Sequence, residues 1–119
     1  MAPSTDAALL AAYAQYQSLN ADLYRAALDD NDACSALTDQ MVGPDAVLLN
    51  VVPTTVAGVN AVLRRLLPAI EGERWLDRAI AFGDDETLEE RRGELPFPYD
   101  QIVSCVLTLT ALARQSKEA

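Results

Sequence analysis

The stretch Val51–Leu67, VVPTTVAGVNAVLRRLL, is the first place in this sequence to look for chemistry, because it combines hydroxyl side chains, a glycine and two arginines. A phosphate-binding loop of the Walker type needs a second glycine followed by Lys and then Ser or Thr, since backbone amides and an ammonium group must surround the phosphates. This stretch has only Gly58 and no lysine. We therefore exclude a phosphate loop and interpret the stretch as a helix start, with Thr54 or Thr55 as its N-cap.

Carboxylates are the second candidate for chemistry. The segment DDNDACSALTDQ, residues 29–40, is rich in oxygen ligands, but it lacks the alternating ligands, central glycine and closing glutamate of a calcium-binding loop. Glu86, Glu89 and Glu90 have the three- and four-residue spacing that places carboxylates on one helix face, as catalytic pairs require. A solvated helix face explains the same pattern more simply. We predict a helix junction at residues 29–40 and a solvated face for the glutamates.

The sequence contains no histidine. This removes an imidazole base, histidine metal ligands and the usual serine and cysteine triads. Cys34 and Cys105 lie in apolar helical patterns, so we predict two small buried hydrophobes of a reducing compartment and no disulfide. We expect no catalytic residue, no cofactor and no metal site. The sequence therefore favours an interaction protein over an enzyme.

The elements that must position these residues are predicted to be helices. Half of the residues are hydrophobic, and alanine and leucine supply most of that half. We predict an all-α fold: one domain over residues 1–119, a helical bundle of about four to five helices with one acidic loop. The first helix starts at an N-cap among Ser4, Thr5 and Asp6 and continues to about Leu28.

The middle of the chain contains two helix breakers. The aspartates of residues 29–32 can cap a second helix, which Gly43–Pro44 breaks or kinks. The segment Asp45–Val52 stays open between helix and strand because it is rich in valine. In the next helix, Gly58 indicates a close approach by another helix. The apolar stripe of that helix recurs at intervals of three and four: Val56, Val59, Leu63, Leu66 and Ile70, widened by Val62 and Leu67.

The last third of the chain alternates between apolar and acidic segments. Pro68 kinks the preceding helix or begins another, in which Ile70, Trp75, Ala79 and Phe82 are predicted to face inward. The polar stretch Gly83–Pro98 is predicted to be a flexible loop with at most one or two helical turns. The final segment from Tyr99 is apolar on nearly every side, so we expect a helix buried on both sides.

The formal net charge of −9 is unevenly distributed. No Lys or Arg occurs from Ala26 to Leu63, which disfavours direct nucleic-acid binding. The first basic residue is Arg25, so the charged start of a signal peptide is missing. No apolar segment reaches the ~18 residues of a membrane span. We predict a cytoplasmic protein that does not bind membranes.

The order Pro53, Thr55, Gly58, Ala61 leading into an apolar helix carries a resemblance. With two helices before it and a final helix near the C-terminus, the chain resembles short helical proteins of uncharacterised function that are common in alphaproteobacterial genomes, some of them near mobile elements. The resemblance covers most of the chain and implies a helical fold. It brings no catalytic residue to any position of this sequence.

Two functions fit the sequence. The first is an interaction or assembly protein whose surplus apolar surface is covered by a second copy, as a homodimer, or by another protein. The alternative is an acidic inhibitor that imitates nucleic acid and occupies a basic groove. An almost uncharged last helix favours the homodimer. The candidate interface residues come from the first and last helices: Tyr13, Tyr16, Val103, Leu107 and Ala111.

Overall fold

The computed structural model describes residues 6–26 and 30–118. These residues form six α-helices and one 3-10 helix without any strand among them, so the predicted all-α class is confirmed and the predicted number of helices was too low. The elements are α1 (Ala7–Arg25), α2 (Asn31–Asn50), α3 (Val56–Glu71), α4 (Arg74–Ala81), α5 (Asp85–Arg91), η1 (Arg92–Glu94) and α6 (Tyr99–Glu118). None of the described helices is long and apolar enough to cross a membrane.

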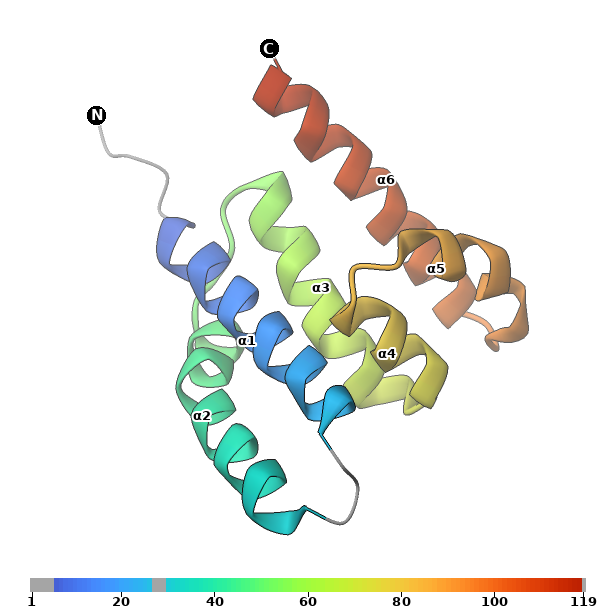
Figure 1. Cartoon of the computed structure of the whole chain (residues 1–119). Coiled ribbons are helices and arrows are strands. Elements are labelled where there is room, and N and C mark those ends of the chain that lie inside the picture. The colour runs from blue at the N-terminus through green and yellow to red at the C-terminus, as the bar shows by residue number, and fades with distance from the viewer. Residues whose placement is uncertain (1–5, 27–29, 119) are drawn as a thin grey trace.

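Helix α3 lies at the centre of the arrangement (Figure 1). On one side of it, α1 and α2 form an antiparallel pair, and on the other side α6 runs alongside α3. Each side has its own apolar core, and α3 contributes to both. The first core contains Leu9, Ala12, Leu48 and Ala61, and the second contains Leu67, Leu76, Ala79, Ile80, Leu88, Leu95 and Val103.

Helix α2 passes through Gly43 and Pro44 without interruption, so the predicted break was wrong. The segment left open between helix and strand continues α2 as far as Asn50. Proline removes one backbone donor, but Pro44 lies on the same face as Met41 and Leu48, and all three are buried. Burial of this face, mainly against α1, compensates for the missing hydrogen bond.

Helix α3 likewise continues through Pro68 and ends where Gly72 adopts a left-handed conformation with φ of 78°. This turn changes the direction of the chain before α4 begins. The inward-facing positions of α4 therefore do not continue the spacing of those in α3. Two of the four positions predicted to face inward do so and two do not: Trp75 and Ala79 pack on the second core, whereas Ile70 and Phe82 are exposed.

The acidic segment Gly83–Pro98 contains the one or two helical turns expected in it, as the seven residues of α5, and η1 follows them directly. Asp84 caps α5 by accepting hydrogen bonds from the backbone amide and hydroxyl of Thr87, at 3.1 and 2.7 Å. The segment also brings Leu88 and Leu95 into the second core. These two leucines are the physical reason for order in a segment whose composition is otherwise that of a loop.

Helix α6 is not enclosed, which corrects the expectation that it is buried on both sides. It contacts only α3, α5 and η1 among the described elements. Its outer face therefore stays exposed at Gln101, Cys105, Thr108 and Leu112. Cys105 is exposed and Cys34 is half-buried, so the prediction of two buried cysteines was wrong.

Candidate functional site

The Thr-Thr pair before α3 binds a carboxylate that belongs to this same chain. Thr55 is the N-cap of α3, as predicted, and its hydroxyl accepts a hydrogen bond from the amide of Gly58 at 3.0 Å. The carboxylate of Asp6, at the start of α1, accepts hydrogen bonds from the amides and hydroxyls of Thr54 and Thr55, at 2.5–3.0 Å. The stretch thus does bind an anion, but the anion is the side chain of Asp6.

The close approach predicted at Gly58 is made by this carboxylate. Asp6 is fully buried, and a Cβ atom on Gly58 would overlap its carboxyl group. The hydroxyl of Thr55 is the largest contribution to a pKa of Asp6 below the ordinary value of 3.8, while burial opposes the shift. Asp6 therefore fastens the start of α1 to the start of α3 as a charged group.

Arg64 ties α3 to α5 and α6 from inside the protein. Arg64 is only 7% exposed, so it is one of the buried residues of α3. It donates to both carboxylate oxygens of Asp85, at 2.9 and 3.2 Å, and to the hydroxyl of Thr110 at 2.8 Å. Asn60 donates to the same hydroxyl at 2.9 Å, which fixes α3 and α6 in antiparallel register.

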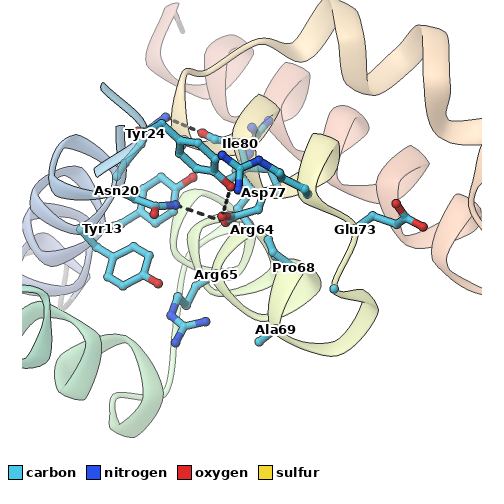
Figure 2. Close-up of a pocket in the computed structure, with 15 residues that line it drawn as sticks. Tyr13, Asn20, Tyr24, Arg64, Arg65, Pro68, Ala69, Glu73, Asp77 and Ile80 are labelled. Atoms are coloured by element: carbon cyan, nitrogen blue, oxygen red, sulfur yellow. Dashed lines mark hydrogen bonds between the residues drawn. The ribbon is translucent and has the colours of Figure 1, made fainter. Parts of the chain in front are cut away.

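A half-open pocket of about 340 Å³ lies between α1, α3 and α4, next to this network. Figure 2 shows α1 contributing Tyr13, Asn20 and Tyr24, while α3 contributes Arg64, Arg65 and Pro68. The pocket lies where the two apolar cores meet, so its walls are built from polar side chains. Its remaining lining residues are Tyr16, Gln17, Ala69, Gly72, Glu73, Arg74, Asp77, Ile80 and Ala81.

Asp77 of α4 is held by two residues of α1 (Figure 2). Asn20 donates to one carboxylate oxygen at 3.1 Å, and the hydroxyl of Tyr24 donates to the other at 2.5 Å. Burial, together with this hydrogen bond, raises the pKa of Tyr24 to about 12. Both oxygens of the pocket carboxylate are thus engaged by the protein itself.

Two arginines stack on the tyrosines of the pocket. The guanidinium of Arg65 lies 4.9 Å from the ring centre of Tyr16, and that of Arg74 lies 5.1 Å from the ring centre of Tyr24. Arg65 also forms an ion pair with Asp45 through its Nε and Nη2 atoms. Its Nη1 atom donates no hydrogen bond to the part of the chain that the structure describes.

Tyr13 is the pocket residue with an unmet hydrogen-bonding group. Its hydroxyl is inaccessible to solvent and makes no hydrogen bond within the described residues. Burial raises the pKa of Tyr13 to about 12, and the neighbouring charge of Arg64 opposes this shift. The hydroxyl is therefore a neutral donor throughout the physiological range.

A second candidate surface is the outer face of α3. Five residues of the apolar stripe read from the sequence, here called the α3 seam, lie outside the two cores, whereas Val62 and Leu67, which widen that stripe, pack in them. The buried face of α3 consists of Gly58, Ala61, Arg64 and Leu67 instead. The α3 seam consists of Val56, Val59, Leu63, Leu66 and Ile70, which are exposed or half-buried in every case.

The predicted interface residues do not form one surface. Val103 is fully buried in the second core, and Leu107 packs against that core. Ala111 is exposed on α6, while Tyr13 and Tyr16 are half-buried at the pocket on α1. Within the described chain α1 and α6 make no contacts, so these residues lie on separate faces.

The exposed acids are also divided. Asp30, Asp32 and Asp39 lie on and before α2, and the three glutamates 86, 89 and 90 lie on α5, all solvent-exposed as predicted for the glutamates. Helices α2 and α5 make no contacts with one another among the described elements and lie at opposite sides of the molecule (Figure 1). The acids therefore form two separate groups.

No pattern in the sequence indicated the pocket, because its residues come from three helices and only the fold brings them together. A comparison with known proteins adds no further assignment: no family model, no curated protein and no solved structure matches this chain.

Proposed function

We propose that this protein is a small helical interaction protein that associates with a second copy of itself through the α3 seam. The observation that carries the proposal is the spacing of the seam residues. They recur at intervals of three, four, three and four, which is the a/d pattern of helices that pair side by side. A monomeric helix normally turns such a stripe toward its own core.

Exposure at the two ends of the α3 seam supports this proposal. Val56 and Val59 are 41% and 36% exposed at the start of α3, and Ile70 is 61% exposed at its end. Covering large apolar side chains yields roughly 25 cal/mol for each Å² removed from water. A partner along the whole length of α3 would therefore gain stabilisation from each end of the seam.

Charge supports an identical partner. The chain carries a net charge of −9, so two copies repel each other wherever their charged surfaces meet. The α3 seam contains no charged residue, and four exposed positions of the adjoining helix α6 are uncharged as well: Gln101, Cys105, Thr108 and Leu112. This face is where two copies approach with the least repulsion, and a two-fold axis makes one seam complementary to another.

The test is the molar mass in solution, measured by light scattering at about 10–100 μM, where a dissociation constant in the micromolar range is visible. We expect about twice 12.9 kDa for the unmodified protein. Ile70→Asp should raise the dissociation constant by about 100-fold or more, because it buries an unpaired charge in the seam. Val42→Asp is the matched control, since Val42 is exposed on α2 away from the seam.

A mass of 12.9 kDa for the unmodified protein over this concentration range would refute the proposal. So would a dimer that Val42→Asp weakens and Ile70→Asp leaves intact. Both substituted positions are exposed, so circular dichroism should give the same helix content for the two variants and the parent.

A further inference from the structure

We propose that the pocket between α1, α3 and α4 binds a small organic carboxylate. The inference is independent of the α3 seam and rests on which hydrogen-bonding groups of the pocket are already engaged and which are not. Both oxygens of Asp77 accept hydrogen bonds from the protein, and Glu73 directs its carboxylate away from Asp77 (Figure 2), whereas N–H groups of Arg65 and Arg74 have no partner among the described residues.

The engaged group is Asp77, whose two oxygens accept from Asn20 and Tyr24. A cationic ligand would need this carboxylate and the faces of the tyrosine rings. One face of Tyr16 and one face of Tyr24 already receive guanidinium groups. The pocket is therefore poorly suited to an amine or a quaternary ammonium ion.

The donors without partners are on Arg65 and Arg74. Within the described chain, Arg74 donates no hydrogen bond and forms no ion pair, so all its N–H groups are available. The Nη1 atom of Arg65 is likewise without an acceptor. Guanidinium groups bind carboxylates through paired N–H groups, and such charge-assisted bonds are about twice as strong as neutral ones.

The pocket is less acidic than the chain as a whole. It is lined by three of the chain's nine Lys and Arg residues and by two of its eighteen acids, Glu73 and Asp77. Arg64 and Arg65 are paired with Asp85 and Asp45. Arg74 is therefore the lining cation whose charge is left for an anionic ligand.

The rest of the pocket fixes the size and character of the ligand. Its apolar lining comes from Pro68, Ala69, Ile80 and Ala81. A volume of about 340 Å³ is at the lower end for ligand pockets. A carboxylate attached to one ring or a short hydrocarbon chain fits these properties better than an inorganic anion does, because only an organic ligand covers the apolar wall.

The probe is benzoate, added to the ¹⁵N-labelled protein while amide chemical shifts are recorded by NMR. We expect shifts at pocket residues with a dissociation constant of about 1 mM, a modest affinity for a ligand of this size. Acetate and inorganic phosphate carry the same kind of oxygens without the ring and should bind at least about tenfold more weakly.

Arg74→Gln removes the available guanidinium and should weaken benzoate binding by about tenfold or more. Arg78→Gln is the matched control, because Arg78 lies on the same helix but stacks on Phe82 outside the pocket lining. Both arginines are exposed, so neither change should unfold the protein. The proposal is overturned by unchanged affinity in Arg74→Gln, by equal binding of acetate, phosphate or tetramethylammonium, or by no shifts at about 20 mM benzoate.

Discussion

Asp6 combines full burial with a negative charge, and the surrounding donors explain how both are possible. Two backbone amides and two hydroxyls of Thr54 and Thr55 replace the water that the carboxylate loses. They stand at the N-terminus of α3, where the helix dipole also favours an anion. A buried carboxylate held in this way stabilises the fold only while it is ionised.

Stability in acid should therefore depend on Asp6. Because its folded-state pKa is lowered, its contribution is complete above the ordinary pKa of 3.8 and is lost as the pH falls through the folded value. We expect Asp6→Asn to destabilise the protein at neutral pH, since an amide presents a donor to the donors of Thr54 and Thr55. Urea unfolding followed by circular dichroism between about pH 7 and pH 2 should give curves that converge in acid.

Asp39→Asn is the control for this measurement, because Asp39 is exposed on α2. It should keep the pH dependence of the parent. A stability difference between Asp6→Asn and the parent that stays constant down to the lowest pH would show that the charge of Asp6 does not matter.

Gly58 should be required only because Asp6 is present. Gly58→Ala displaces the carboxylate from its donors, and we expect a loss of about 1–3 kcal/mol, as for other overpacked sites. In an Asp6→Ala background the same change should be stabilising by up to about 1 kcal/mol, since alanine favours a helix more than glycine does. A double-mutant cycle of unfolding free energies measures this coupling. Additive effects would contradict the contact.

At the scale of elements, the side chain of Arg64 joins three helices, α3, α5 and α6. We expect Arg64→Ala to lower the free energy of unfolding by about 1.5–3 kcal/mol, because Asp85 and Thr110 lose a charged partner inside the protein. Arg25→Ala removes an exposed pair with Asp22 and should change stability by less than about 1 kcal/mol. Chemical denaturation of the two variants tests the comparison, and equal losses would contradict a structural role for Arg64.

Helical class and several caps were predictable because they depend on neighbours in the sequence. Thr55 caps α3, and Asp30 caps α2 by accepting a bond from the amide of Ala33 at 3.0 Å. Whether Pro44 and Pro68 end their helices was not predictable in the same way. Pro44 stays within its helix because a neighbouring helix buries it, which is tertiary information.

The candidate sites also divide into one that the sequence pattern indicates and one that depends on tertiary contacts. The α3 seam was visible as a periodic stripe, but periodicity alone does not say whether an apolar face meets the core or the solvent. The pocket could not be predicted from the sequence. Tyr24 and Asp77 are distant in the sequence and meet only where α1 lies against α4. The burial of Arg64 was not predictable either, because arginine is rarely buried without a partner and its partners Asp85 and Thr110 are distant in the sequence.

At the scale of the whole molecule, the surface has distinct regions. Acidic side chains cover α2 and α5, the pocket gathers arginines, and the face made by α3 and α6 is nearly free of charge between its ends. A small protein usually intersperses charges over its surface for solubility. An uncharged face with an apolar seam on such a protein is best explained by a covering partner, and our account assigns that role to a second copy.

The most direct test of this self-association is an isotope-filtered nuclear Overhauser experiment on a mixture of ¹³C-labelled and unlabelled protein, which detects only contacts between different copies. Our account expects cross-peaks to the methyl groups of Val56, Val59 and Ile70 and none to those of Val42. Cross-peaks confined to methyl groups outside the α3 seam, or a complete absence of intermolecular cross-peaks at millimolar concentration, would contradict it.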